Sequence, residues 1–201
     1  MTGSYRKDLS HITWAEVYKR QEMRAGLVEE WLEALALQPG DRVLDMGSGP
    51  GFVSLVLADR VGVGGVVYAI DRSAEALAYL EGLQRERGIV QIQRITADAA
   101  ALEPADLPAN LPADAAMISM VLHHADDPPG ILRNVERMIV PGGRVLVAEF
   151  HPEGPGEQGP PQEHRIAPER IQAWCQDAGL AVQDYQRQTP ESYMILAQRP
   201  F

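Results

Sequence analysis

A glycine-rich segment and a later acidic residue carry the clearest chemistry in this chain of 201 residues. The segment reads Arg42-Val43-Leu44-Asp45-Met46-Gly47-Ser48-Gly49-Pro50-Gly51-Phe52, and Asp71 follows twenty residues after Gly51, at the end of an apolar run. This order predicts a strand, a glycine turn, a helix and a second strand that ends in an acid. Such a unit presents backbone N–H groups beneath a bound nucleoside and a carboxylate to its ribose hydroxyls. The sequence therefore predicts a nucleoside-cofactor site.

The glycine spacing separates two classes of nucleoside cofactor. A dinucleotide fingerprint, G-x-G-x-x-G, needs its third glycine for close packing of the helix beside the pyrophosphate. Gly47 and Gly49 fit that fingerprint, but Phe52 stands at the third position. The segment instead reads D-x-G-x-G-x-G from Asp45 to Gly51. In this form it resembles motif I of the class I S-adenosylmethionine-dependent methyltransferases, whose acidic first residue lies near the methionine end of the cofactor.

The resemblance covers roughly residues 40–200. Segment 96–99 is similar to the part of that family that contacts the adenine edge, and segment 132–147 is similar to its helix, turn and fifth strand. The resemblance is closest to the ubiquinone- and menaquinone-pathway methyltransferases, and it implies S-adenosylmethionine as cofactor and S-adenosylhomocysteine as product. The implied cofactor-binding residues are Asp45, Gly47, Ser48, Gly49, Gly51, Asp71, Arg72, Ala97, Asp98 and Ala99.

Histidines are expected near the same edge of the sheet. We expect His123 and His124 to end the fourth strand, His151 to end the fifth, His164 to lie in the following loop, and His11 to precede the N-terminal helix. Three interpretations stay open: polar contacts around the cofactor, general-base catalysis by a neutral imidazole, and a metal site. We favour His123 or His124 as the catalytic base. No ligand spacing such as H-x-x-x-H is present, so no metal is expected.

The acceptor site is harder to predict. Trp14 and Tyr18 lie four residues apart near the start of the N-terminal helix, and they could form an aromatic wall over the ligands or pack in the core. Substrate choice should come from the N-terminal segment and from the loop 151–166, so the candidate acceptor-binding residues are Trp14, Tyr18, His151 and His164. The resemblance implies a small-molecule acceptor, for example an aromatic or quinone-like one methylated on carbon or oxygen.

Two other functions remain open on the sequence. A nicotinamide-dependent oxidoreductase would also use Asp71 on ribose, although Phe52 breaks its spacing. A non-catalytic cofactor-binding protein would keep the glycine turn without a productive acceptor pocket. Cys175 lies on an expected helix and is interpreted as a small core residue, which argues against methyltransferases that need nucleophilic or metal-binding cysteines.

Bulk composition agrees with one compact enzyme domain. The formal charge of −10 and the pI near 4.9 argue against a nucleic-acid partner, which usually needs a basic face. A single cysteine cannot form an internal disulfide, and no apolar run approaches the ~20 residues of a membrane span. With no signal-peptide core at the N-terminus, we expect a cytoplasmic protein. The oligomeric state cannot be read from the sequence.

The elements that must position these residues alternate between helix and strand. A single helix is expected from Ile12 to Leu37, so residues 1–38 form a helical lid segment and residues 39–201 the methyltransferase domain. The further expected helices are 50–61, 73–87, 129–139 and 168–178. One further strand is expected to begin at residue 66. The others are expected over 89–95, 115–122, 144–150, 181–188 and 192–198. Alternation implies an α/β, Rossmann-like, doubly wound sheet. The last two strands should form an antiparallel hairpin, which matches the family's seven-stranded, mostly parallel sheet with an antiparallel last strand.

Overall fold

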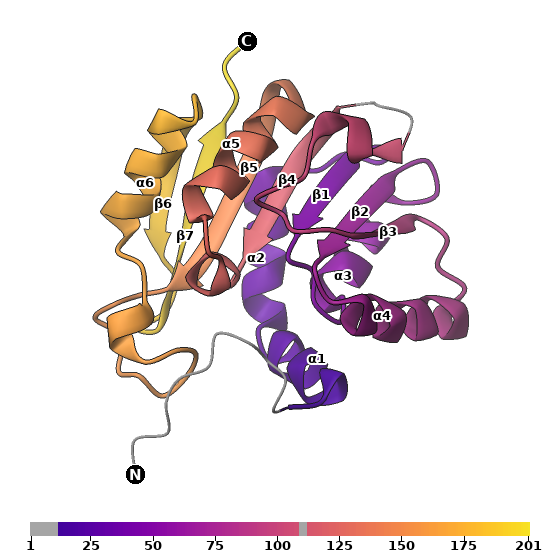
Figure 1. The fold of residues 1–201 in the computed structure, drawn as a ribbon, viewed down its shortest axis with the longest axis horizontal. Helices are drawn as coiled ribbons and strands as arrows, with labels where there is room; N and C mark the ends of the chain where they lie inside the picture. The colour runs from indigo at the N-terminus through magenta and orange to yellow at the C-terminus, as the bar shows by residue number, and fades with distance from the viewer. Residues whose placement is uncertain (1–11, 109–111) are drawn as a thin grey trace.

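The computed structural model describes residues 12–108 and 112–201, and His11 lies outside this part (Figure 1). One seven-stranded sheet runs through the molecule, with helices on both faces. The elements in chain order are α1 (Trp14–Glu22), α2 (Ala25–Leu35), β1 (Arg42–Met46), α3 (Phe52–Val61), β2 (Val66–Asp71), α4 (Ala74–Arg87), β3 (Ile92–Thr96), η1 (Pro104–Asp106), β4 (Ala113–Ser119), η3 (Leu122–His124), α5 (Pro128–Met138), β5 (Ile139–Phe150), η4 (Gln162–His164), α6 (Pro168–Asp177), β6 (Ala181–Arg187) and β7 (Ser192–Gln198).

The strand order confirms the predicted fold class. The sheet runs β3-β2-β1-β4-β5-β7-β6, and β7 pairs antiparallel with both β5 and β6 while the other pairs are parallel. The chain moves outward from β1 to β3 and then returns to place β4 on the other side of β1. Ligands of open α/β sheets bind where the strand order reverses, outside the carboxyl ends of the strands. In this protein that point lies at the ends of β1 and β4.

Two apolar layers hold the sheet, one on each face. Helices α2, α3 and α4 cover one face and α5 and α6 cover the other. Neighbouring residues of one strand serve different layers: Val43 belongs to the first core and Leu44 to the second. Because both faces are buried, the central strands are almost continuously apolar. The carboxylates that interrupt these strands therefore need a specific explanation.

The single N-terminal helix expected from Ile12 to Leu37 is in fact two helices. α1 ends at Glu22, and α2 begins at Ala25 after Arg24, whose φ of −97° and ψ of 13° leave the helical region. The two segments contact different parts of the molecule. α2 buries Val28, Trp31, Leu32 and Leu35 in the core, whereas α1 lies beyond the strand ends (Figure 1). One straight helix could not make both sets of contacts, and the apolar periodicity does not register the break.

The fourth strand ends earlier than expected. β4 stops at Ser119, and Met120 takes a φ of +56°, which turns the chain away from the sheet. His123 and His124 consequently lie in η3, a 3₁₀ turn beyond the strand, and they do not end it. The fifth strand starts earlier than expected, at Ile139. Segment 141–143, expected to be a separate turn, is part of β5 at an irregular register with β4.

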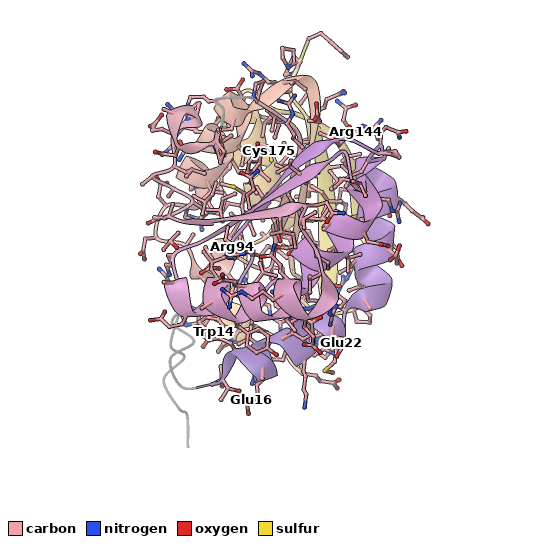
Figure 2. The ribbon with its side chains drawn as sticks, turned by 90° about the vertical axis from the view of Figure 1, so that its right-hand side faces the viewer. Trp14, Glu16, Glu22, Arg94, Arg144 and Cys175 are labelled. Carbon is pink, nitrogen blue, oxygen red and sulfur yellow. The ribbon has the colours of Figure 1, made fainter. Side chains whose placement is uncertain are left out.

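Cys175 is a core residue, as interpreted from the sequence. It is fully buried on α6, and burial raises the pKa of its thiol to about 12. Figure 2 shows Cys175 well away from Trp14, Glu16 and Glu22, which label α1 at the lower end of the view. In the part of the chain that the structure describes, no helix has the length and apolar character needed to cross a membrane.

Candidate active site

A cavity of about 1280 Å³ lies at the carboxyl ends of the parallel strands. Its walls come from the turns that follow β1 to β4, from the end of β5, from the loop after it, and from α1 and α2. In Figure 1, α1 lies below the edge toward which the arrowheads of β1 and β2 point. Pockets for a single ligand usually measure about 300–1,000 Å³, so this one has room for two ligands.

The turn after β1 forms its part of the wall with main chain alone. Gly47, Gly49 and Gly51 have φ values of +75°, +55° and +87°, which side chains rarely permit. A Cβ atom at Gly47 would lie 2.2 Å from Cγ2 of Val121, and one at Gly51 would lie 2.4 Å from Cδ1 of Leu80. The glycines are therefore required by both conformation and space.

Only part of this turn reaches the cavity. Gly47 and Gly49 line it, whereas Ser48 and Gly51 are buried behind it. The Oγ atom of Ser48 is buried and has no hydrogen-bond partner among the described residues. An unpartnered hydroxyl beside a main-chain cradle is a feature that a polar ligand group can satisfy.

Asp71 lines the cavity at the end of β2. Its Oδ2 accepts a hydrogen bond from the N–H of Gly49 at 2.8 Å, and its Oδ1 accepts one from the N–H of Ser73 at 2.8 Å. Burial raises the pKa of this carboxyl, while the two N–H donors and the charge of Arg72 oppose the rise. Each oxygen keeps a further lone pair. The carboxylate is thus held in place and can still accept two hydroxyl donors.

The turn after β3 supplies the next part of the wall. Ala97, Asp98 and Ala99 all line the cavity, together with Arg72 after β2. Oδ1 of Asp98 accepts a hydrogen bond from the N–H of Ala100 at 2.9 Å, which fixes the turn. Polar groups at the ends of β2 and β3 with small side chains between them suit a flat heterocycle and its sugar. Seven of the ten predicted cofactor-binding residues line the cavity, and the other three, Asp45, Ser48 and Gly51, are buried and do not line it.

Asp45, an implied cofactor-binding residue, has a structural partner. Its Oδ2 accepts a hydrogen bond from Oγ of Ser54 on α3 at 2.5 Å. Asp45 is almost fully buried and is not among the residues that line the cavity. Burial raises its pKa to about 7, the bond from Ser54 opposes that rise, and the charge of Asp71 adds to it.

Gln21 is a site residue that the sequence interpretation missed. Its Nε2 donates to the carbonyl of Ser48 at 3.2 Å, and its Oε1 accepts from the N–H of Phe52 at 3.1 Å. Phe52 is the first residue of α3, whose cap residue, Gly51, offers no side-chain hydrogen bond. A neutral amide from α1 thus caps α3 at the point where dinucleotide-binding folds place a pyrophosphate.

The second missed residue is Glu149, the partner of His123. Oε2 of Glu149 lies 2.7 Å from Nδ1 of His123, and Oε1 accepts the N–H of His123 at 3.3 Å. The N–H of Phe150 donates to the same carboxylate at 3.2 Å. Burial alone would raise the pKa of Glu149, but the charge and hydrogen bonds of His123 outweigh burial and hold that pKa below its usual value. A glutamate in the apolar run 145–150 was the available sequence signal.

This arrangement orients the imidazole of His123. With Nδ1 directed at Glu149, Nε2 is the nitrogen left for the cavity that His123 lines. His124 lines the same cavity, and its ring centroid lies 4.1 Å from that of His123. Such a carboxylate and imidazole pair is suited to accept a proton from a bound hydroxyl.

The other two predicted histidines do not reach the cavity. His151 is buried with its ring against Tyr193, and its Nδ1 accepts the N–H of Glu153 at 3.1 Å. Burial lowers the pKa of His151, with the charge of Arg187 adding to that effect. His164 lies exposed in η4. Neither is among the lining residues, so the structure does not bring them together with His123.

The two aromatic residues of α1 that were candidates for the acceptor site differ in their positions. Trp14 lines the cavity, whereas Tyr18 is buried beside it. The ring of Tyr18 packs edge-on against Phe52 at 5.7 Å, and its hydroxyl accepts a hydrogen bond from Arg87 at 3.2 Å. Tyr18 therefore packs α1 against the domain and does not form the ligand-facing wall.

The loop after β5 reaches the cavity through residues 157–160. Arg165, which is buried, holds this loop: its side chain donates to the carbonyls of Gln158 and Pro160 at 2.6 and 3.0 Å. It also forms an ion pair with Glu191 at 2.6 Å, and Glu191 accepts the N–H of Glu157. The proline- and glycine-rich loop is thus a fixed wall of the cavity.

No metal site is found in the part of the chain that has been described. Residues 12–108 and 112–201 hold no group of three or more His, Cys, Asp or Glu side chains arranged to bind a metal ion.

Comparisons with known proteins agree with this geometry. The model of a methyltransferase domain family matches residues 37–196. A ubiquinone biosynthesis O-methyltransferase from Pseudomonas putida is 33% identical over 171 residues, covering 77% of this chain and 70% of that protein. Among solved structures, a SAM-dependent methyltransferase from Aquifex aeolicus matches with a TM-score of 0.80 at 22% identity, covering 94% of this chain and 99% of the other.

A third neighbour was solved with ligands. The 1,6-didemethyltoxoflavin-N1-methyltransferase of Burkholderia thailandensis, with bound 1,6-didemethyltoxoflavin and S-adenosylhomocysteine, matches with a TM-score of 0.70 at 19% identity, covering 93% of this chain and 82% of the other. The extent of the family match and the 33% identity show that this chain belongs to the methyltransferase domain family. It is an S-adenosylmethionine-dependent methyltransferase, and the nicotinamide and non-catalytic alternatives are set aside.

Proposed function

We propose that this enzyme transfers a methyl group to a hydroxyl oxygen of a small molecule. The observation that carries the proposal is the buried pair of His123 and Glu149 on the wall of a cavity large enough for two ligands. A hydroxyl group loses its proton as its oxygen is methylated, and a basic side chain beside it can accept that proton. The P. putida relative, an O-methyltransferase of ubiquinone biosynthesis, supports the same choice of acceptor atom.

In this proposal the cofactor lies along the ends of β1, β2 and β3. Asp71 accepts hydrogen bonds from the ribose hydroxyls, and segment 97–99 contacts the adenine. Gly47 and Gly49 allow the ligand to approach the main chain, with Ser48 and Gly51 shaping the turn behind them. The orphaned Ser48 hydroxyl and the position of Gly47 and Gly49 on the cavity wall fit such a ligand.

In the same proposal, His123 and Glu149 act on the methyl acceptor. S-Adenosylmethionine supplies an electrophilic methyl group on a sulfonium, which departs as a neutral thioether. As the acceptor oxygen forms its new bond to that methyl carbon and the carbon–sulfur bond breaks, Nε2 of His123 takes the hydroxyl proton. Glu149 keeps Nδ1 protonated and stabilises the resulting imidazolium. Close placement of the two ligands contributes much of the rate, because the sulfonium is already a good leaving group.

The proposal extends to the lid, to the class of substrate and to the cellular location. We assign the lid role to α1, because α2 is part of the core. The net charge of −10 favours a small molecule over a nucleic acid, and cytoplasmic residence agrees with the single, unpaired cysteine.

Calorimetric titration with S-adenosylmethionine, S-adenosylhomocysteine and NAD tests the cofactor assignment. We expect micromolar binding of the first two and none of NAD. Asp71→Ala should weaken binding of S-adenosylhomocysteine by about 100-fold, because two charge-assisted hydrogen bonds are lost. Near-normal affinity in a folded Asp71→Ala protein would remove Asp71 from the site.

A further inference from the structure

Arg24 is a cation in the cavity that forms no ion pair within residues 12–108 and 112–201. Arg24 lies between α1 and α2, and it lines the cavity. Its guanidinium carbon lies 5.8 Å from the centroid of the Phe150 ring, a cation–π contact, and no described carboxylate forms an ion pair with it. The contrast is Arg165, which also lies over Phe150, at 5.5 Å, but is paired with Glu191.

The guanidinium of Arg24 keeps its charge at neutral pH. Burial lowers its pKa to about 10; the charge of Glu149 opposes this, and the charge of Arg20 adds to it. Arg20 lines the same cavity, so two like charges face one space. Glu149 acts on Arg24 through its charge but forms no ion pair with it, and its oxygens accept hydrogen bonds from His123 and Phe150. A bound anion would relieve this repulsion.

Arg24 belongs to the half of the cavity that holds His123. Both side chains flank Phe150, since the ring centroids of His123 and Phe150 are 5.7 Å apart. Phe150 ends β5, and the order β2-β1-β4-β5 puts β5 three strand spacings from Asp71 on β2. At ~4.8 Å per spacing, about 14 Å separates these two strands. Arg24 is therefore far from the ribose-binding end of the cavity.

We propose that Arg24, together with Arg20, binds an anionic group on the methyl acceptor. A carboxylate fits best, because a guanidinium can hold it with two parallel hydrogen bonds. The acceptor would then be a hydroxylated ring that bears a carboxylate, with its carboxylate at Arg24, its ring near Phe150 and its hydroxyl toward His123. This inference rests on the proposed function and adds the charge of the substrate to it.

Two probes that differ only in the carboxylate test this assignment. We would titrate 3,4-dihydroxybenzoate and catechol into protein saturated with S-adenosylhomocysteine. Wild-type protein should bind 3,4-dihydroxybenzoate about 10- to 100-fold more tightly than catechol. Arg24→Met should remove this preference without changing the affinity for catechol or for S-adenosylhomocysteine. Arg24→Lys should keep part of it, because the charge stays and the two-pronged geometry is lost.

The control is Arg85→Met, which removes an exposed arginine on α4 that pairs with Glu81 and should leave both affinities unchanged. Equal affinity of wild-type protein for the two probes, or binding of neither, would overturn the proposal. So would a loss in Arg24→Met of affinity for S-adenosylhomocysteine but not for 5′-methylthioadenosine, which lacks the amino-acid carboxylate. If S-adenosylhomocysteine does not bind wild-type protein at all, the proposed function fails first, and this inference fails with it.

Discussion

At the scale of single residues, the proposed mechanism assigns the transfer of the acceptor's proton to the pair of Glu149 and His123. Glu149 lies entirely inside the protein, 2.7 Å from Nδ1 of His123. Replacing the carboxylate by an amide removes the charge that orients and stabilises the imidazole. We expect Glu149→Gln to lower kcat about 100-fold while the KM for S-adenosylmethionine changes little.

The measurement is steady-state kinetics on a hydroxylated acceptor, with a double-mutant cycle. Glu149 acts through His123, so Glu149→Gln combined with His123→Ala should be no slower than His123→Ala alone. Glu153→Gln is the matched control, because Glu153 is exposed and pairs only with Arg187 at the surface. Additive losses in the double variant would show that Glu149 acts independently of His123.

Residue types at strand ends could be predicted from the sequence, whereas their partners could not. The glycine turn, Asp71 and segment 97–99 follow one another at strand ends in the order that the resemblance implies, and the structure brings them to one cavity. Glu149 and Gln21 depend on contacts with residues 26 to 31 positions away. Only the folded chain creates such pairs. The hydrogen bond from Ser54 to Asp45 is a pair of the same kind.

At the scale of elements, α1 is tied to the start of α3 by one side chain. Gln21 makes two hydrogen bonds across this junction, to Ser48 and Phe52. We expect Gln21→Leu to weaken binding of S-adenosylmethionine about tenfold, since the glycine turn loses its external support. Amide hydrogen exchange at residues 48–52 should quicken in the same variant.

Calorimetry measures the affinity for S-adenosylmethionine, and mass spectrometry measures the amide hydrogen exchange at residues 48–52. Gln183→Leu is the control, because Gln183 lies exposed on β6 and bonds only the carbonyl of Ala181. Unchanged exchange at residues 48–52 in Gln21→Leu would contradict the role given to this link.

The periodicity of the sequence predicted which segments are helices and which are strands, but it did not predict where they end. The hairpin of β6 and β7 and the alternation of helix and strand are confirmed. The break at Arg24 and the early end of β4 at Ser119 were missed, because both depend on tertiary packing. Met120 turns the chain with a positive φ that no glycine signalled.

At the scale of the whole molecule, the buried carboxyl of Asp45 links stability to pH. Its pKa is raised from 3.8 to about 7 in the folded state, chiefly by burial. The stabilisation from its protonated form is therefore complete below pH 4 and is lost as pH rises toward 7. Above that pH the folded protein bears a buried charge, at a cost on the order of 4 kcal/mol.

Asp45→Asn removes that charge. We expect the variant to be more stable than wild-type protein at pH 8 by a few kcal/mol and similar to it at pH 4, as measured by urea unfolding. Asp59→Asn, an exposed position on α3, should show no such trend. A variant that is less stable at every pH would mean that the bond from Ser54 outweighs the cost of burial.

The proximity of Asp45 and Asp71 also affects how ligands exchange with solvent. Asp45 lies next to the last residue of β1 and Asp71 ends the neighbouring β2; burial raises the pKa of both, and the charge of Asp71 further raises that of Asp45. A sulfonium bound near Asp45 favours the ionised form of this carboxyl, whose pKa is about 7, so cofactor binding near neutral pH should release protons to the buffer. The neutral thioether lacks this effect. The heat of cofactor binding will therefore vary with the ionisation enthalpy of the buffer. After methyl transfer, the bound S-adenosylhomocysteine carries no sulfonium charge, so the carboxyl takes up protons from the buffer again.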